Sequence, residues 1–132
     1  MKIMKTNISP RYKRDNIESF LLISPKTTDS KNLSVTLVEM GVKGIQKIHS
    51  HKPEQMYYIL EGEGIMTVNN EEKKVIPGDC IFILSNSNHG LINTGNKKLK
   101  YLSAASPSFT KKQCEEYWSL KSVKSSNSFA KP

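Results

Sequence analysis

Cysteine is scarce in this 132-residue chain, which has only Cys80 and Cys114. Two isolated thiols can build neither a disulfide framework nor a CxxC motif, so we expect both to stay reduced. No apolar run approaches the roughly 20 residues that span a bilayer; the longest, such as Met56 to Leu60 and Cys80 to Leu84, are strand-sized. The basic start, Met1 to Asn7, is not followed by the apolar region of a signal peptide. We therefore expect a cytoplasmic protein without a membrane span.

Arginine is also scarce, since it supplies only two of the 20 basic residues behind the net charge of +8. That charge is terminal: residues 1–14 carry +5 and residues 111–132 carry +3, while ten lysines and ten acids cancel over residues 15–110. Lysine lacks the bidentate geometry with which arginine recognises phosphate and guanine. We therefore expect no dedicated nucleic-acid partner, although a basic adaptor that docks through its ends on an acidic partner stays open.

Helical periodicity is missing from the first 105 residues. Instead, short segments rich in Val, Ile, Leu, Tyr and Phe alternate with turn signals, for example at residues 61–64 and 77–79. This pattern predicts local antiparallel hairpins and an all-β barrel or sandwich. The nine expected strands are 20–24, 33–40, 45–51, 55–60, 64–68, 73–76, 80–84, 90–93 and 99–104.

The length suits one domain with one core. We expect an N-terminal segment that is partly strand at 1–19, a barrel at 20–107, a short helix at 108–121 and a disordered tail at 122–132. Thr110 followed by Gln113 fits a capping box that opens the helix. The tail is rich in serine and lysine and has too few apolar residues to bury a core of its own.

The chain has only three histidines, and two of them, His49 and His51, lie two apart on an expected strand, so both face the same side. Gln55 shares their parity, and a bend at Lys52-Pro53 would bring it back toward the pair. His89 follows a polar turn and opens another strand. Imidazoles suit transition metals, and an amide oxygen is a neutral additional ligand. An H-x-H pair alone is more often a pair of exposed residues on a surface strand.

The spacing resembles the first motif of the cupin superfamily, which is G, five residues, H-x-H, three or four residues, E, six residues, G. His49, His51 and Gly62 match it. Gln55 stands at the position of the family's usual glutamate ligand, and Gly44 lies one residue closer to His49 than the pattern prescribes.

The second cupin motif is G, five residues, P-x-G, two residues, H, three residues, N. Gly78, His89 and Asn93 are in register with it, whereas Leu84 and Asn86 replace the proline and the glycine. Asn86 can adopt a left-handed turn conformation, so we expect the turn to survive. We expect Asn93 to fix its turn and strand.

The resemblance covers about residues 20–107. It implies a jelly-roll barrel that holds one divalent transition metal (Fe, Mn, Ni, Co or Zn) and acts on a small polar molecule. The implied metal ligands are His49, His51, Gln55 and His89. Because glutamine removes a negative charge, the metal would be held by neutral donors, which suits a carboxylate-bearing substrate. Glu54, of opposite parity, should point away.

The resemblance favours a metal-dependent, non-redox enzyme similar to sugar or sugar-acid isomerases and epimerases. An oxygen-dependent dioxygenase and a non-catalytic module that binds or senses a small ligand are the alternatives. Tyr57 shares parity with the ligands and is a candidate proton donor, although a core role fits it equally well. We expect Phe82 and Tyr101 to pack inside the barrel.

The opposite face of the Gln55 strand is apolar too, with Met56, Tyr58 and Leu60. A barrel wall that faces water would carry polar residues there. We therefore expect this face to be covered by residues 17–23 or by a second subunit, and the family resemblance favours a homodimer.

Overall fold

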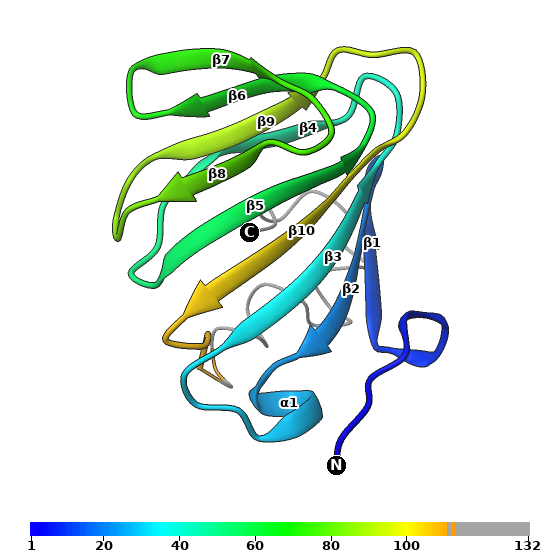
Figure 1. The fold of residues 1–132 in the computed structure, drawn as a ribbon, viewed down its shortest axis with the longest axis vertical. Coiled ribbons are helices and arrows are strands. Elements are labelled where there is room, and N and C mark those ends of the chain that lie inside the picture. The colour runs from blue at the N-terminus through cyan, green and yellow to red at the C-terminus, as the bar shows by residue number, and fades with distance from the viewer. Residues whose placement is uncertain (111, 113–132) are drawn as a thin grey trace.

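The computed structural model describes residues 1–110 and 112, which form two antiparallel β-sheets (Figure 1). The helical elements are one turn of 3-10 helix, η1 (Thr6–Ile8), and one turn of α-helix, α1 (Pro25–Thr28). The strands are β1 (Arg11–Arg14), β2 (Ile17–Ile23), β3 (Ser34–Met40), β4 (Ile45–His49), β5 (Glu54–Glu61), β6 (Gly64–Val68), β7 (Glu71–Val75), β8 (Cys80–Ile83), β9 (His89–Asn93) and β10 (Leu99–Ser106). The all-β expectation is confirmed.

Six strands form one sheet in the order β1-β2-β3-β10-β5-β8, and four form the other in the order β4-β9-β6-β7. From β3 to β6 and again from β7 to β10, successive strands alternate between the sheets, as in a jelly roll. Along β3 and β10, every second side chain is buried, because successive residues of a strand point to opposite faces. The inward residues of both sheets build the main apolar core, whose largest members include Tyr57, Tyr101, Met40, Leu91 and Leu99. A smaller cluster contains Tyr12, Leu21, Ala105 and Phe109.

Two motif positions adopt left-handed backbone conformations. Gly62 has a φ of +80°, and a Cβ there would lie 2.5 Å from the carbonyl oxygen of Lys98. Only glycine fits a turn that is both left-handed and this close to a neighbouring strand. Asn86 has a φ of 63°, which confirms that asparagine can replace glycine in the second motif.

The N-terminal strands lie beside the barrel rather than over its outer face. β2 pairs with β3, and β1 pairs with β2, so together they extend the edge of the six-stranded sheet. Residues 17–23 therefore do not cover the apolar face that the sequence analysis identified. α1 was not expected; Ser24 caps it in a reciprocal capping box with Thr27, and Pro25 occupies its first turn.

The expected C-terminal helix and tail lie outside the described residues, apart from positions 108–110 and 112. Within the described part of the chain, no helix is long and apolar enough to cross a membrane.

Candidate metal centre

The three histidines converge inside the barrel from two neighbouring strands. His49 ends β4, His89 begins β9 directly opposite it in the register, and His51 follows two residues after His49. One nitrogen of each ring lies within 4.8 Å of the others, and the ring centroids are 4.3 to 5.5 Å apart. His89 is fully buried and His51 is 8% exposed. This separation is suited to three nitrogens that share one metal ion.

Backbone carbonyls fix two of the imidazole rings. The Nδ1 atom of His49 donates to the carbonyl oxygen of Lys47 at 2.8 Å, and Nδ1 of His89 donates to that of Ser87 at 2.9 Å. A proton on Nδ1 leaves the lone pair on Nε2. Both rings therefore present an unprotonated Nε2 that can bind a metal, because the hydrogen bond at Nδ1 fixes the tautomer and the orientation of the ring.

Two hydrogen bonds connect the loop between β8 and β9 to the loop that carries His51. The backbone N–H of Asn86 donates to the carbonyl oxygen of His51 at 2.9 Å, and the Ser85 hydroxyl donates to that of Lys52 at 2.5 Å. The left-handed conformation of Asn86 permits the first of these bonds. The turn of the second motif thus helps to position a histidine of the first.

Gln55 enters the same interior from β5 and is 2% exposed. Its amide nitrogen, Nε2, donates to the Ser103 hydroxyl at 2.7 Å, and its oxygen, Oε1, is buried without a hydrogen-bond partner among the described residues. Burial and the neighbouring His89 lower the pKa of His51, and polar contact with Gln55 partly opposes that fall, as an acceptor oxygen near the ring does. Glu54, as expected, is exposed on the opposite face.

The residues present fit a bound metal ion. Burying a polar atom without a partner is costly, so such atoms are rare and call for a reason. Several of those buried without a hydrogen-bond partner in the described chain belong to this cluster: Nε2 of His49, both ring nitrogens of His51, Oε1 of Gln55 and Nε2 of His89. One cation bound among them would satisfy ring nitrogens and the amide oxygen together.

Burial keeps these rings neutral and available as ligands at neutral pH. It lowers the pKa of His49 and His51 to about 4, and the neighbouring His89 lowers both further. Burial also lowers the pKa of His89. A positive charge on any ring would be poorly solvated and would repel its neighbours.

The metal-free protein is therefore expected to lose stability as the pH falls from about 6.5 toward 4. In an unfolded chain, histidine titrates near 6.5, whereas folded His49 and His51 titrate near 4. Between these values the unfolded chain binds more protons, so the free energy of unfolding rises with pH and reaches its plateau above the unfolded pKa. Urea unfolding of chelator-treated protein across this range measures the slope. Replacing all three histidines with asparagine should reduce it, and an unchanged slope would contradict this assignment.

Tyr57 is fully buried beside the cluster, with its ring 6.0 Å from that of His89. Its hydroxyl donates to Oε1 of Gln46 at 3.2 Å, and Nε2 of Gln46 donates to the Tyr101 hydroxyl at 2.9 Å. Burial raises the pKa of Tyr57, and its hydrogen bonds to Gln46 and Tyr101 oppose that rise. Tyr57 is therefore a neutral phenol tied into a buried network.

Sequence reasoning missed three residues that adjoin the cluster: Phe109, Ser103 and Gln46. Phe109 is 1% exposed, and its ring packs edge-on against His51 at 5.1 Å. Ser103 holds Gln55, and Gln46 holds Tyr57. Inward parity on β10 could have singled out Ser103, a polar residue at a core position. Gln46 has the opposite parity to His49 and faces inward because the strand register shifts between them, so no sequence signal marked Gln46 or Phe109.

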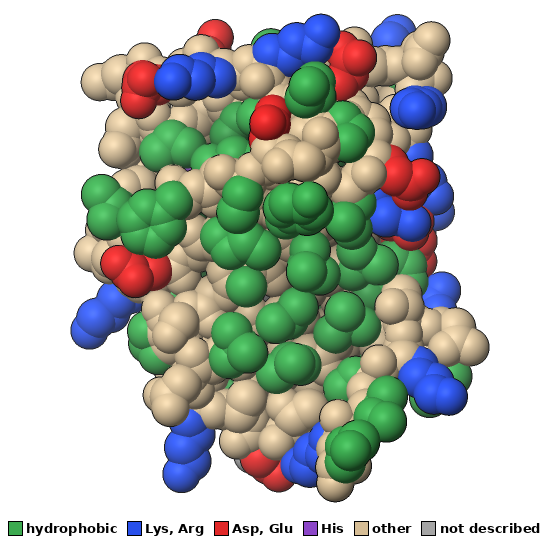
Figure 2. Space-filling model, in the orientation of Figure 1, with side chains coloured by type: hydrophobic (Ala, Val, Ile, Leu, Met, Phe, Trp, Pro, Cys, Tyr) green, Lys and Arg blue, Asp and Glu red, His purple; other side chains and the backbone are tan. Residues whose placement is uncertain are grey.

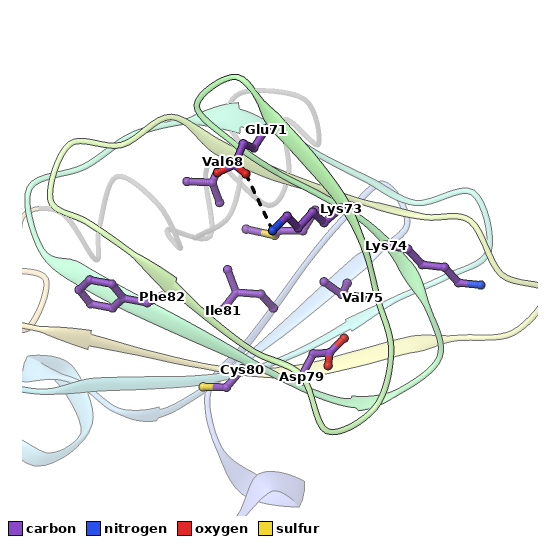
Figure 3. Close-up of a pocket in the computed structure, with 10 residues that line it drawn as sticks. Val68, Glu71, Lys73, Lys74, Val75, Asp79, Cys80, Ile81 and Phe82 are labelled. Atoms are coloured by element: carbon purple, nitrogen blue, oxygen red, sulfur yellow. Dashed lines mark ion pairs between the residues drawn. The ribbon is translucent and has the colours of Figure 1, made fainter.

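A separate cavity of about 410 Å³ lies along the seam between β7 and β8 (Figure 3). Met66, Val68, Val75 and Ile81 contribute apolar walls, and no histidine lines it. Its lysine at position 73 pairs with the carboxylate of Glu71 at 3.9 Å. None of the described residues that line this cavity has a buried side-chain nitrogen or oxygen without a hydrogen-bond partner, in contrast to the histidine cluster.

The expectation that Tyr101 packs inside the barrel is confirmed, but that for Phe82 is wrong. Tyr101 is fully buried, whereas Phe82 is 60% exposed. β8 is apolar on both faces, and its alternation turns Ile81 and Ile83 inward and Cys80 and Phe82 outward. Cys80 is an exposed free thiol.

Comparison with known proteins agrees with the observed fold. The model of the cupin domain family matches residues 36–105. The chain is 35% identical to the uncharacterized protein MJ1618 of Methanocaldococcus jannaschii over 121 residues, covering 87% of this chain and 95% of that one. It is 28% identical to the oxalate-binding protein of Thermotoga maritima over 109 residues, covering 77% and 90%. The structure of KdgF from Halomonas superposes with a TM-score of 0.74 at 14% identity, covering 85% and 98%. The chain belongs to the cupin domain family.

Proposed function

We propose that the protein holds one divalent transition metal at His49, His51, His89 and Gln55 and binds a small carboxylate-bearing molecule at that metal. The observation that carries the proposal is the set of buried acceptor atoms on these four residues, which have no partner among the described residues. Mixed imidazole and amide donors suit iron, manganese, nickel, cobalt or zinc. When bound, such a metal supplies Lewis-acid polarisation of a coordinated oxygen.

The charge of the donor set supports an anionic ligand. Three neutral imidazoles and one amide leave the charge of a divalent cation uncompensated, and the cluster includes no carboxylate. The adjacent acid, Glu54, lies on the exposed face of its strand. An anion that reaches such a centre is attracted more strongly than it would be beside a carboxylate ligand. The relative that is named an oxalate-binding protein supports the same class of ligand.

The test is metal content followed by ligand titration. Protein purified without chelator should contain close to one transition metal per chain. A metal at 100 times its dissociation constant should stabilise the chelated protein by about 2.7 kcal/mol, or about 10 °C in melting temperature. Calorimetry should then detect oxalate binding to the loaded protein only. Absence of metal, together with no thermal shift from Fe, Mn, Ni, Co or Zn, would refute the site; metal without oxalate binding would refute the ligand.

The finer proposal is a non-redox isomerisation or epimerisation of a sugar acid at this centre. Such a step moves a proton, and Tyr57, whose ring lies 6.0 Å from that of His89, is the proposed proton donor. Tyr57→Phe should lower kcat for a sugar-acid substrate and leave metal affinity unchanged. Two rival functions give other results: an oxygen-dependent enzyme consumes oxygen in its iron form, and a binding module holds oxalate without turnover.

The homodimer is a further part of the proposal, and it rests on the outer face of the six-stranded sheet. Hydrophobic side chains gather across this face (Figure 2). Phe82 is 60% exposed, Leu84 59%, Leu60 40% and Tyr58 39%. At one edge, Lys100 pairs with Glu61 at 3.0 Å. An apolar centre with a charged rim is the anatomy of a protein interface, and a second copy offers a self-complementary one.

Phe82→Glu is expected to convert the dimer to a monomer. It places a charge on the most exposed aromatic side chain of the proposed interface, on the edge strand β8, which should weaken association by about 100-fold or more. Light scattering after size exclusion at micromolar concentration measures the mass. Ile48→Glu is the matched control, because Ile48 is 56% exposed on β4 of the other sheet. A monomeric wild-type mass, or a Phe82→Glu variant that stays dimeric, would contradict the interface.

A cytoplasmic location is also proposed. Its support is the exposed free thiol of Cys80, since reducing compartments preserve such groups. Fractionation of the source cells tests it, and recovery of the protein from an oxidising compartment would overturn it.

A further inference from the structure

Ser103 is a polar exception on an apolar strand face. The side chains that β10 turns inward are Leu99, Tyr101, Ser103 and Ala105, and all four are buried. Ser103 is 3% exposed, and its register partners are Thr36 on β3 and Tyr57 on β5. A buried hydroxyl costs free energy unless it is hydrogen-bonded. The partner of this hydroxyl is therefore informative.

That partner is Gln55. In the register, Gln55 lies opposite Ala105, so Ser103 is its diagonal neighbour on the same inward face. Nε2 of Gln55 donates to Oγ of Ser103 at 2.7 Å, a short bond between two buried groups. The other end of the amide, Oε1, is left without a partner among the described residues.

The two ends of an amide are nearly equal in size but opposite in chemistry. The oxygen has lone pairs for a metal, whereas the NH₂ group has only donors and would be repelled by a cation. A half-turn of the Gln55 amide would exchange them. The hydrogen bond to Ser103 engages the NH₂ group, so the oxygen is the end that stays available to the histidines.

We propose that Ser103 is a positioning residue of the metal centre, whose hydroxyl holds the Gln55 amide with its oxygen directed to the metal. This inference rests on the proposed metal site and extends it to a residue outside both sequence motifs. Outer partners of this kind orient a ligand before the metal arrives, so less ordering is left to the binding step.

The test uses Co²⁺, whose visible absorption spectrum reports the number and type of its ligands, and competition with a chelator, which gives its dissociation constant. Ser103→Ala should weaken Co²⁺ binding by about 10- to 100-fold, as loss of an outer partner does. Its spectrum should move toward that of Gln55→Ala. In the double variant, the second change should add little, because both act through the same ligand.

Three further variants separate positioning from packing. Ser103→Thr and Ser103→Val have side chains of the same shape and differ only in the hydroxyl, so only the threonine variant should retain the wild-type spectrum. This comparison tests the role of the hydroxyl even if Ser103→Ala fails to fold. Ser19→Ala removes another fully buried serine hydroxyl from the inward face of the same sheet and should change neither readout.

Wild-type affinity and spectrum in the valine variant would overturn the inference. So would identical spectra of the wild type and Gln55→Ala, which would remove Gln55 from the ligands but leave the three-histidine site intact. A wild-type protein that binds no Co²⁺ would instead refute the proposed function itself.

Discussion

His89→Ala is expected to abolish the thermal stabilisation that Co²⁺ or Ni²⁺ gives the wild-type protein. The His89 ring neighbours both others, 4.3 Å from His49 and 5.0 Å from His51 between centroids. Four-ligand sites bind metal with about 10–16 kcal/mol, or roughly 3 kcal/mol per ligand. Losing one nitrogen should therefore weaken binding by about 100-fold. Differential scanning fluorimetry at fixed metal concentration measures the loss.

The chain itself supplies a sharp control for this experiment. All three of its histidines belong to the cluster, so no other imidazole can hold the metal. His49→Ala and His51→Ala should repeat the effect, whereas Tyr57→Phe, which removes only a hydroxyl bonded to Gln46, should leave metal affinity near that of the wild type. Full stabilisation of the His89 variant by metal would place the metal elsewhere.

The histidine cluster could be predicted from the sequence because its positions follow from local rules. The H-x-H spacing of the first motif keeps His49 and His51 close together, although β4 ends at His49 and His51 lies in the loop after it, and the second motif places His89 at the start of β9. Gln55 needed a bend between β4 and β5, which the structure provides. The hydrogen bond from Asn86 that holds this region joins positions far apart in the chain, so spacing alone could not show it.

What the sequence could not predict depends on register and on which face of a strand is buried. Phe82 lies in a strand that is apolar on both sides, so periodicity could not tell its inward from its outward residues. The proposed role of Ser103 depends on a diagonal contact with Gln55, which lies 48 positions away in the chain. β1 has three charged residues among four, and the apolar pattern that marks a strand is absent there. β1 is extended because it pairs with β2, and this pairing is not visible in its composition.

Asn93→Ala is expected to lower the free energy of unfolding more than any other single polar substitution proposed above. It should leave metal affinity unchanged. Asn93 is 2% exposed. Its Nδ2 lies 3.1, 3.0 and 2.9 Å from the carbonyl oxygens of Met40, Gly41 and Lys97, and its Oδ1 accepts from the N–H of Gly95. One amide thus joins the end of β3 to the β9–β10 turn. Its removal leaves several backbone groups without partners.

Each buried group left unpaired costs about 1–3 kcal/mol; with partial access to water, the total should be about 3 kcal/mol, or about 10 °C in melting temperature. Urea unfolding of metal-free protein measures it. Asn93→Asp keeps the shape and the acceptor but loses the donors, so it should be no more stable than the alanine variant. Asn93 lies four residues from His89, about 13 Å along a strand, so folded Asn93→Ala should bind Co²⁺ like the wild type. A loss below about 1 kcal/mol would contradict the stability prediction and show that water replaces these hydrogen bonds. Weaker metal binding by the folded variant would contradict the second part and show that Asn93 helps to position the metal site.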